Sequence, residues 1–338
     1  MKQGSLLKAL TLCLGSLTLS AQAYTVGLAM PTQLEDRWYK DGFALEKKLQ
    51  ANGFNVELFF GGDNDIKLQN RQIKRMTDAK VDLMVVGAID CTVLVDSLAK
   101  TQQAKIPVIS YDRLILNTNA ITYYATFDNF EVGVMQGQYI KKKLNLDSGN
   151  HKTMEIFYGS LDDNNAKFFY EGAMSILYPY IKMGILTVPS GQIKPEETAT
   201  EGWSTDVALK RMESLVESQG YSPNGKKLDA VLSPSDAISS GVIFTLKRHG
   251  YTPSNIPVIT GQDATQEAIA NVKSGYQAMT IYKSSEALSD VVVDMAKAIS
   301  QGKEVEVNDS FTYNNGSADM HSYLLEPKLV DKTNISQF

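Results

Sequence analysis

Residues 82–89 read Asp-Leu-Met-Val-Val-Gly-Ala-Ile, an almost continuous apolar run. Such a run is typical of a strand that is covered on both faces, as the strands of parallel sheets are. Helical patterns at 66–77 and 92–103 lie on either side of it, so helix and strand alternate here. This alternation predicts an α/β fold in which parallel strands are connected through helices.

The same alternation continues along the chain from residue 24 to residue 300. The other expected strands are 24–30, 55–60, 107–111, 122–127, 153–158, 186–188, 228–232, 257–260 and 278–282. The other expected helices are 36–51, 130–143, 166–181, 206–218, 238–249, 266–273 and 287–300. About ten strands are too many for one small sheet, and a domain usually takes roughly 150 residues. We therefore predict two doubly wound parallel-sheet domains.

The tail of the chain after residue 304 has a different character. Residues 305–312 and 323–330 are strand-like and lie on either side of Asn314-Asn315-Gly316. Asn-Gly is a strong signal for a tight turn between strands. The tail is therefore expected to form either a hairpin or a pair of crossover segments.

The first 23 residues have the pattern of an export signal. Lys2 and Lys8 are their only charges, an apolar stretch covers 6–19, and Ala21-Gln22-Ala23 follows. A basic start, an apolar middle and an A-x-A site are typical of a secretory signal peptide. We expect cleavage after Ala23, with an uncleaved anchor as the alternative. Cleavage removes Cys13 and leaves Cys91 as a single thiol, either a packing residue or a reactive group.

The composition excludes several functional classes. A net charge of −5 argues against a nucleic-acid partner, which requires a basic surface. The sequence contains no G-x-S-x-G, H-E-x-x-H or C-x-x-C motif, and no dinucleotide-binding G-x-G-x-x-G after the first strand. The three histidines are scattered, whereas a zinc site needs clustered ligands. We therefore expect no cofactor and no metal.

Polar side chains follow most of the expected strands, at the edge where open α/β sheets bind their ligands. These residues are Arg37, Asp90, Asp112, Arg113, Asn164, Asn165, Asp236, Asp263 and Lys283. The nearby aromatic residues are Trp38, Phe168, Phe169 and Trp203. Planar polar groups can bind sugar hydroxyls, and aromatic rings can pack against the C–H faces of a sugar. The pattern therefore favours a carbohydrate site.

Each of these residues also has an ordinary structural role open to it. Asp112 and Arg113 could form a surface ion pair, and residues 162–165 or 235–236 could only cap the helices that follow. Trp38 could belong to the core of its helix. The carbohydrate interpretation therefore depends on the convergence of these residues on one side of both sheets.

Several longer stretches add a family resemblance. They are Ile109-Ser-Tyr-Asp-Arg113, Tyr123-Tyr-Ala-Thr-Phe-Asp-Asn129, Asp162-Asp-Asn-Asn-Ala166, Phe169-Tyr-Glu-Gly-Ala-Met174, Val231-Leu-Ser-Pro234, Gly261-Gln-Asp263 and Tyr323-Leu-Leu325. In these stretches the chain resembles the class I periplasmic sugar-binding proteins of bacterial ABC importers, of the ribose/galactose/xylose type. It is most similar to their ChvE-like multiple-sugar-binding members, over nearly all of the chain after residue 23.

The resemblance implies two α/β subdomains that are joined by a three-segment hinge and hold a sugar in the cleft between them. The N-terminal sugar-binding subdomain would comprise 24–128 and about 264–296. The C-terminal subdomain would comprise about 129–263 and about 297–338. The mature protein would be a monomer in the periplasm.

The resemblance also implies which residues bind the sugar. They are Arg37, Trp38, Asp90, Asp112, Arg113, Asn164, Asn165, Phe169, Trp203, Asp236, Asp263 and Lys283. The cationic side chains would donate hydrogen bonds to the sugar, the carboxylates would accept them, and the amides could do both. Trp38, with Trp203 or Phe169, would flank the ring.

The function that the resemblance implies is capture of a monosaccharide such as glucose, galactose, arabinose or xylose, without catalysis. The closed form would deliver the sugar to an ABC permease and its ATPase, and a chemoreceptor or sensor kinase could also bind the closed form. Two alternatives remain open from the residues alone. A secreted glycosidase would use paired carboxylates, and the sensing core of a LacI-type regulator would need an N-terminal DNA-binding segment.

Overall fold

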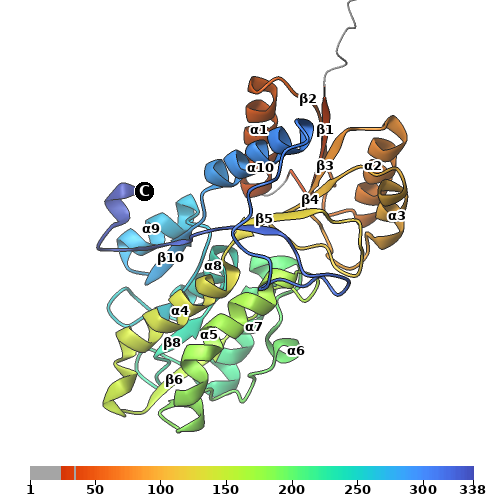
Figure 1. Cartoon of the computed structure of the whole chain (residues 1–338). Coiled ribbons are helices and arrows are strands. Elements are labelled where there is room, and N and C mark those ends of the chain that lie inside the picture. The colour runs from red at the N-terminus through yellow and green to blue at the C-terminus, as the bar shows by residue number, and fades with distance from the viewer. Residues whose placement is uncertain (1–23, 34–35) are drawn as a thin grey trace, which may run out of the picture.

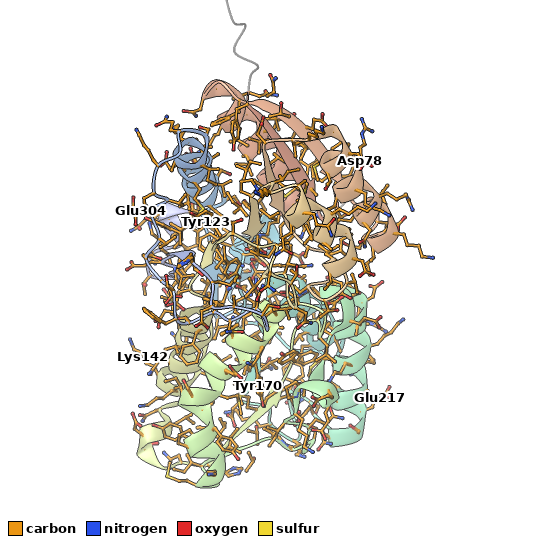
Figure 2. All side chains as sticks on the ribbon, turned by 45° about the vertical axis from the view of Figure 1, so that its right-hand side comes forward. Asp78, Tyr123, Lys142, Tyr170, Glu217 and Glu304 are labelled. Atoms are coloured by element: carbon orange, nitrogen blue, oxygen red, sulfur yellow. The ribbon has the colours of Figure 1, made fainter. Side chains whose placement is uncertain are left out.

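The computed structural model describes residues 24–33 and 36–338, and the expected signal peptide lies outside these ranges. The described chain forms two lobes, one above the other in Figure 1. Figure 2 shows Asp78, Tyr123 and Glu304 on the first lobe, and Lys142, Tyr170 and Glu217 on the second. Among the described helices, none has the length and apolar character needed to cross a membrane.

The first lobe is built on a six-stranded sheet with the order β11-β5-β4-β3-β1-β2. Its strands are β1 (Thr25–Met30), β2 (Asn55–Phe60), β3 (Leu83–Val86), β4 (Val108–Tyr111), β5 (Tyr123–Phe127) and β11 (Ser322–Leu325). Its helices are α1 (Asp36–Ala51), α2 (Ile66–Ala79), α3 (Val95–Gln103) and α10 (Ser285–Ser300). Every strand pair in this sheet is parallel, as the sequence predicts.

Helices cover both faces of the first sheet, because its strands are apolar on both sides. Along β1, Val26 and Leu28 face a core that includes residues of α1 and α10. Ala29 faces a second core that includes residues of α2 and α3. All residues of β3 are buried, which explains the apolar run at 82–89.

The second lobe contains a four-stranded parallel sheet with the order β7-β6-β8-β9. Its strands are β6 (Lys152–Ile156), β7 (Leu186–Thr187), β8 (Ala230–Leu232) and β9 (Val258–Ile259). Its helices are α4 (Asn129–Leu144), α5 (Asn164–Lys182), α6 (Pro195–Thr198), α7 (Thr205–Gln219), α8 (Asp236–Arg248) and α9 (Gln266–Ser274). A two-stranded antiparallel pair, β10 (Met279–Tyr282) and β12 (Lys328–Asp331), lies beside them. Single 3₁₀ turns are η1 (Leu146–Ser148), η2 (Glu201–Trp203) and η3 (Ile335–Gln337).

Helices α4 and α5 approach each other closely through glycines. A Cβ atom at Gly133 would lie 2.0 Å from the backbone oxygen of Phe169, and one at Gly172 would lie 2.1 Å from the backbone oxygen of Phe130. Only glycine fits at such contacts. The close packing holds α5, and therefore its N-terminal residues, in a fixed position against the second lobe.

The strand pairing corrects two of the expected subdomain boundaries. Residues 264–282 were expected in the first unit, but β10 packs against α4 and α5 of the second lobe. Residues 297–325 were expected in the second unit, but Val305 lies in the first-lobe core and β11 pairs with β5. Residues 264–282 belong to the second lobe because β10 extends it beside β9, where the N–H of Ala278 donates to the carbonyl of Ile259.

The tail forms crossover segments, one of the two expected arrangements, and no strand covers 305–312. The expected strand at 323–330 is instead two strands, β11 and β12, in different sheets. The turn at Asn315-Gly316 closes an irregular loop, which the Asn315 side chain fixes by donating to the carbonyl of Thr118 at 2.7 Å. The chain thus passes between the lobes after β5, after β10 and after β11.

Candidate functional site

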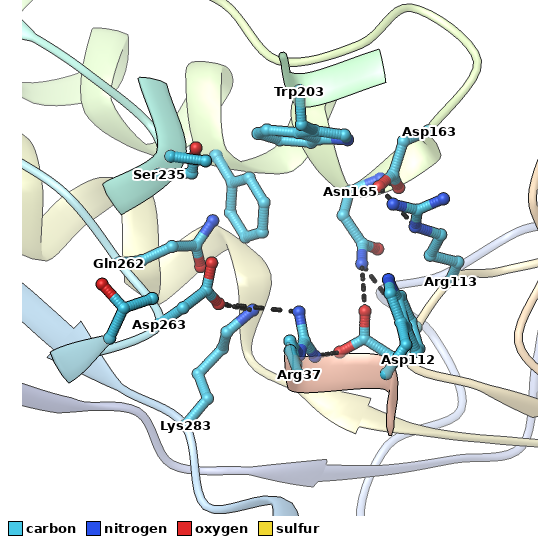
Figure 3. A pocket seen from close by; sticks show the side chains of 14 residues that line it. Arg37, Asp112, Arg113, Asp163, Asn165, Trp203, Ser235, Gln262, Asp263 and Lys283 are labelled. Carbon is cyan, nitrogen blue, oxygen red and sulfur yellow. Dashed lines mark hydrogen bonds and ion pairs between the residues drawn. The ribbon is translucent and has the colours of Figure 1, made fainter. Parts of the chain in front are cut away.

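A cavity of about 240 Å³ lies between the two lobes, where the carboxyl ends of their strands face each other (Figure 3). Its lining residues are Arg37, Trp38, Asp112, Arg113, Asp163, Asn165, Phe169, Trp203, Ser235, Ala237, Gln262, Asp263, Thr265 and Lys283. They come from the N-terminal parts of α1, α5 and α8, from the loops after β4, β9 and β10, and from η2, which supplies Trp203. This is the edge at which open α/β sheets bind ligands.

Most of the expected site residues line this cavity. They are Arg37, Trp38, Asp112, Arg113, Asn165, Phe169, Trp203, Asp263 and Lys283. The structure therefore brings together residues that are as much as 246 positions apart in the sequence, from Arg37 to Lys283.

The first-lobe wall is centred on Arg37 and Asp112. The guanidinium of Arg37 donates to the Asp112 carboxylate and lies 3.9 Å from Asp41. The carboxylate of Asp112 is buried, and its backbone carbonyl accepts from the hydroxyls of Tyr124 and Thr126 at 2.7 and 2.9 Å. These bonds fix the Asp112 loop to the end of β5.

Two polar contacts join the lobes on one side of the cavity. Nε of Arg113 lies 2.8 Å from Oδ2 of Asp163, and the Nδ2 of Asn165 donates to the carbonyl of Asp112 at 3.0 Å. Figure 3 shows Arg113 beside Asp163, and Asn165 directed toward Asp112. Asp163 also caps α5 by accepting from the N–H of Asn165 at 2.9 Å. The helix cap considered for residues 162–165 is therefore present, whereas Arg113 forms an ion pair with Asp163 across the lobes instead of a surface pair with Asp112.

A row of ion pairs closes the opposite side of the cavity. Oδ1 of Asp263 lies 3.1 Å from Nζ of Lys283 and 3.5 Å from Nη1 of Arg37. Lys283 is buried, with its ammonium 5.7 Å from the ring centroid of Phe169. Lys283 is therefore a buried residue of the cavity wall.

The aromatic residues occupy both walls. Trp38 is 2% exposed and packs with Tyr111, so it is a core residue that also reaches the cavity. The guanidinium groups of Arg37 and Arg113 lie 5.0 and 5.2 Å from its ring centroid. On the second lobe, Trp203 lies edge-on to Phe169 at 6.2 Å.

The position of Trp203 depends on a glycine. A Cβ atom at Gly159 would lie 2.2 Å from the Trp203 ring, so only glycine leaves room for the indole. Trp203 has φ of 57°, and the cavity residues Asp112 and Asp263 have φ of 60° and 98°. Non-glycine residues seldom adopt this left-handed region, and such strain clusters at functional sites.

The charges of the cavity balance. Three cationic groups, Arg37, Arg113 and Lys283, face the three carboxylates Asp112, Asp163 and Asp263. Burial would raise the pKa of Asp112, but Arg37, Lys283 and Arg113 hold it below its usual range. Burial likewise would lower the pKa of Arg37, but the carboxylates of Asp112 and Asp263 raise it. Both groups stay charged, and the equal numbers of cationic and carboxylate side chains leave the cavity with no formal net charge that would favour an ion.

Three buried atoms of the second-lobe wall lack a hydrogen-bond partner among the described residues: Oε1 of Gln262, Nε1 of Trp203 and Oδ1 of Asp263. Oδ1 of Asp263 is ion-paired with Lys283, whereas Gln262 and Trp203 are neutral. A buried polar atom without a partner destabilises the protein unless water or a ligand bonds it. Gln262 and Trp203 thus contribute one acceptor and one donor in the cavity wall whose hydrogen bonds the described residues do not supply.

Three expected site residues do not line the cavity. Oδ1 of Asp90 accepts from the N–H and the hydroxyl of Thr92, both at 2.7 Å, in a local turn. Nδ2 of Asn164 is buried without a partner, but its neighbour Asn165 is the amide that reaches the cavity. Asp236 is turned toward β10, where it accepts from Thr280 at 2.8 Å.

The environment of Asp236 explains its different position. Its carboxylate also accepts from the Gln277 amide at 2.8 Å and from the N–H of Thr265 at 3.0 Å. Burial and the nearby charge of Asp263 raise the pKa of Asp236 to about 7. The group therefore fixes the wall behind the cavity rather than facing the cavity itself.

The cavity contains five residues that the sequence analysis does not assign to the site: Asp163, Ser235, Ala237, Gln262 and Thr265. Each follows a strand in the loop or first helical turn of the predicted ligand edge, so position alone could have identified them. Asp163 and Ser235 lie in strand-end loops for which a helix cap is the alternative role. Ser235 does cap α8, since its hydroxyl accepts from the N–H of Ile238 at 3.3 Å.

Neither the cavity nor the rest of the described chain brings together three or more His, Cys, Asp or Glu side chains suited to a metal ion. The carboxylates of the cavity are instead paired with cationic side chains. The arrangement can bind a small neutral molecule through many hydrogen bonds, between two aromatic walls.

Comparison with known proteins gives consistent matches. The model of the periplasmic binding protein domain matches residues 26–304. The chain is 44% identical to the multiple sugar-binding periplasmic receptor ChvE of Rhizobium radiobacter, over 93% of this chain and 89% of that protein. It is 33% identical to the D-xylose-binding periplasmic protein of Escherichia coli K12, over 96% and 93%. A solute-binding protein of an ABC transporter from Clostridium phytofermentans, solved with bound β-D-glucose, superposes with a TM-score of 0.89 at 43% identity, covering 93% and 95%.

Proposed function

The chain belongs to the periplasmic binding protein domain family, and from that membership we propose that it captures a neutral monosaccharide for an ABC importer. The charge-balanced cavity between the lobes is the observation that carries the proposal. A neutral cavity favours a polyhydroxylated ligand over a sugar acid or an amino sugar, because an ion would leave one charge unpaired in a buried site.

The size of the cavity supports a single sugar ring. Sites for drug-sized ligands occupy about 300–1,000 Å³, whereas this cavity measures about 240 Å³. An aldohexose or aldopentose such as glucose, galactose, arabinose or xylose fits this class better than a disaccharide. The relatives that bind several sugars, D-xylose or β-D-glucose agree with this size class.

Side chains from both lobes would contact the ligand. Arg37, Arg113 and Lys283 would donate to ring or hydroxyl oxygens, while Asp112 and Asp263 would accept from hydroxyls. Asn165 can do both. Trp38 on the first lobe, with Trp203 and Phe169 on the second, would pack against the C–H faces of the ring.

Binding would be coupled to closure of the lobes. The N–H of Cys91 donates to the carbonyl of Asp162 at 3.1 Å, a further contact between the lobes next to the Arg113–Asp163 ion pair. A ligand that contacts both lobes stabilises the closed form relative to the open one. The closed form would dock on the permease and ATPase of the importer in the periplasm, and also on a sensor or chemoreceptor.

We propose that no catalytic step accompanies binding. A glycosidase needs a protonated acid beside the glycosidic oxygen. Burial raises the pKa of Asp163, but Oδ2 pairs with Arg113 and Oδ1 accepts from the N–H of Asn165. Asp112 and Asp263 are likewise paired with cationic side chains. The lining carboxyls are therefore occupied in positioning contacts.

Isothermal titration calorimetry tests the proposal directly. D-Glucose, D-galactose, L-arabinose and D-xylose would be titrated into the protein, with D-glucuronate and D-glucosamine as charged controls. At least one neutral sugar should bind, and the charged controls should bind at least about 10-fold more weakly. The chain has only two tryptophans, and both line the cavity, so intrinsic fluorescence should change in parallel. Absence of binding to every neutral sugar, or turnover of aryl glycosides, would contradict the proposal.

A further inference from the structure

We propose that Gln262 is a specificity-determining residue, which selects among sugars by a hydrogen bond to one hydroxyl group. The inference rests on the proposed function and assigns a role to a residue that is not among the binding residues predicted from the sequence. It follows from the state of the Gln262 side chain in the cavity wall.

The side chain of Gln262 is nearly inaccessible and incompletely bonded. The residue is 2% exposed, and its Oε1 atom has no partner among the described residues. The side chain lines the cavity, and Figure 3 shows it beside Asp263 with its amide directed inward. Since a buried amide oxygen without a partner destabilises a protein, a hydroxyl of the ligand is the group that would complete this site.

The backbone around Gln262 is held rigidly. Its carbonyl accepts from the N–H of Asp236 at 2.9 Å, and the N–H of Asp263 donates to the carbonyl of Ile281 at 2.8 Å. The preceding carbonyl, that of Gly261, accepts from the Gln136 amide at 3.2 Å. The backbone from which the Gln262 side chain projects is therefore pre-organised beside the cavity.

The neighbours of Gln262 are already partnered. Asp263 pairs with Lys283 and Arg37, and the hydroxyl of Ser235 accepts from the N–H of Ile238. Gln262 therefore differs from the charged residues of the cavity, because its hydrogen bonding depends on the ligand. A neutral amide both accepts and donates, which matches a hydroxyl group and not an ion.

The test combines a substitution with deoxy sugars. The probes are the tightest-binding sugar among D-glucose, D-galactose, D-xylose and L-arabinose, and each monodeoxy form of that sugar. With the wild-type protein, one deoxy form should bind roughly 10- to 100-fold more weakly because Oε1 of Gln262 loses its partner. Gln262→Met should weaken binding of the parent sugar by a similar factor and bind that deoxy form about as well as the parent. The other deoxy forms should keep their wild-type ratios.

The controls separate a local effect from a folding defect. Gln219→Met changes an equivalent side chain near the end of α7, outside the cavity, and should leave all affinities unchanged. Gln262→Asn, which keeps the amide but shortens it, provides a second variant if Gln262→Met fails to fold.

The possible outcomes distinguish the two proposals. If the wild-type protein binds a sugar but both Gln262 variants keep every affinity ratio, the role of Gln262 is wrong and the proposed function stands. Equal weakening of all deoxy forms would also overturn the role, since no single hydroxyl is then recognised. If the wild-type protein binds none of the sugars, the proposed function fails and the role of Gln262 fails with it.

Discussion

The two walls of the cavity differ in how their polar atoms are partnered. On the first lobe, Arg37 and Asp112 bond each other, and Asp112 is further fixed by Tyr124. On the second lobe, Gln262 and Trp203 each present a buried polar atom without a protein partner. We infer that the first lobe fixes where a sugar lies, whereas the second lobe, whose bonds the ligand completes, decides which sugar stays bound.

Asp112→Ala tests the first-lobe wall and should have the largest effect of the substitutions considered. Removal of one partner of a buried ion pair typically destabilises a protein by about 3–5 kcal/mol. Asp112 is buried beside Arg37 and also contacts Asn165 of the second lobe. The free energy of unfolding, measured by urea denaturation, should therefore fall by about 3 kcal/mol or more. Asp112→Asn keeps the shape of the side chain and removes only its charge. If the free energy of unfolding falls by less than about 1 kcal/mol in both variants, the Arg37–Asp112 pair does not hold this wall together.

Cys91 reports whether the lobes separate. Its thiol is fully buried and accepts from the backbone N–H of Asn164, a residue of the second lobe. If opening exposes it, sugar at 100 times the dissociation constant should slow alkylation by iodoacetamide about 100-fold. Mass spectrometry of the mature protein would follow the reaction, with Cys91→Ser as the unreactive control. Equal rates with and without sugar would mean that this edge stays closed in both states.

Two carboxylates on opposite lobes should respond to pH with opposite sign. The pKa of Asp112 is lowered, so its stabilisation is present above the unfolded pKa and is lost as the pH falls. The pKa of Asp236 is raised to about 7, so its protonated form is favoured in the folded state. Its contribution to stability is present at acidic pH and is lost as the pH rises from about 4 to about 7.

Urea denaturation of the wild-type protein and of Asp236→Asn across this pH range separates the contribution of Asp236 from that of the other titratable groups. As the pH rises, ionisation of Asp236 should lower the free energy of unfolding by at most about 1.4 kcal/mol per pH unit. Asp236→Asn should lack this slope, so the difference between wild type and variant should change with pH. A constant difference between pH 4 and pH 7 would show that Asp236 is ionised throughout.

Trp203→Phe tests the second-lobe wall and should have the smallest effect of these substitutions. The substitution keeps an aromatic ring but removes Nε1, the donor without a partner. Loss of one hydrogen bond to the ligand should weaken sugar binding by roughly 5- to 10-fold. Calorimetry measures the change, and Trp203→Leu, which also removes the ring, should weaken binding further. Unchanged affinity for Trp203→Phe would exclude the indole N–H from ligand recognition.

The fold was largely predictable because parallel strands covered on both faces have a distinct apolar pattern, as at 82–89. The lobe boundaries were not predictable. Whether β10 and β11 join one sheet or the other depends on long-range pairing, which is not visible in local periodicity. The tail at 305–312 is apolar enough for a strand but is irregular in the structure.

The candidate site was predictable in position but not in side-chain direction. Strand ends correctly indicated the loops of Asp112, Asp263 and Lys283. The same rule selects Asp90, which lies outside the cavity lining because the hydroxyl and N–H of Thr92 offer a local partner that a strand-end rule does not specify. Gln262 lies in a loop that the strand-end rule already indicates, but its distinctive property, a buried amide oxygen without a partner, exists only in the folded chain.

A crystal structure of the protein with its tightest-binding neutral monosaccharide tests the account most directly. We predict one sugar ring in the cavity between the lobes, bonded to Arg37 or Asp112 on one side and to Gln262 or Trp203 on the other. A sugar bound outside this cavity, or held by one lobe alone while Gln262 and Trp203 remain without partners, would contradict the account.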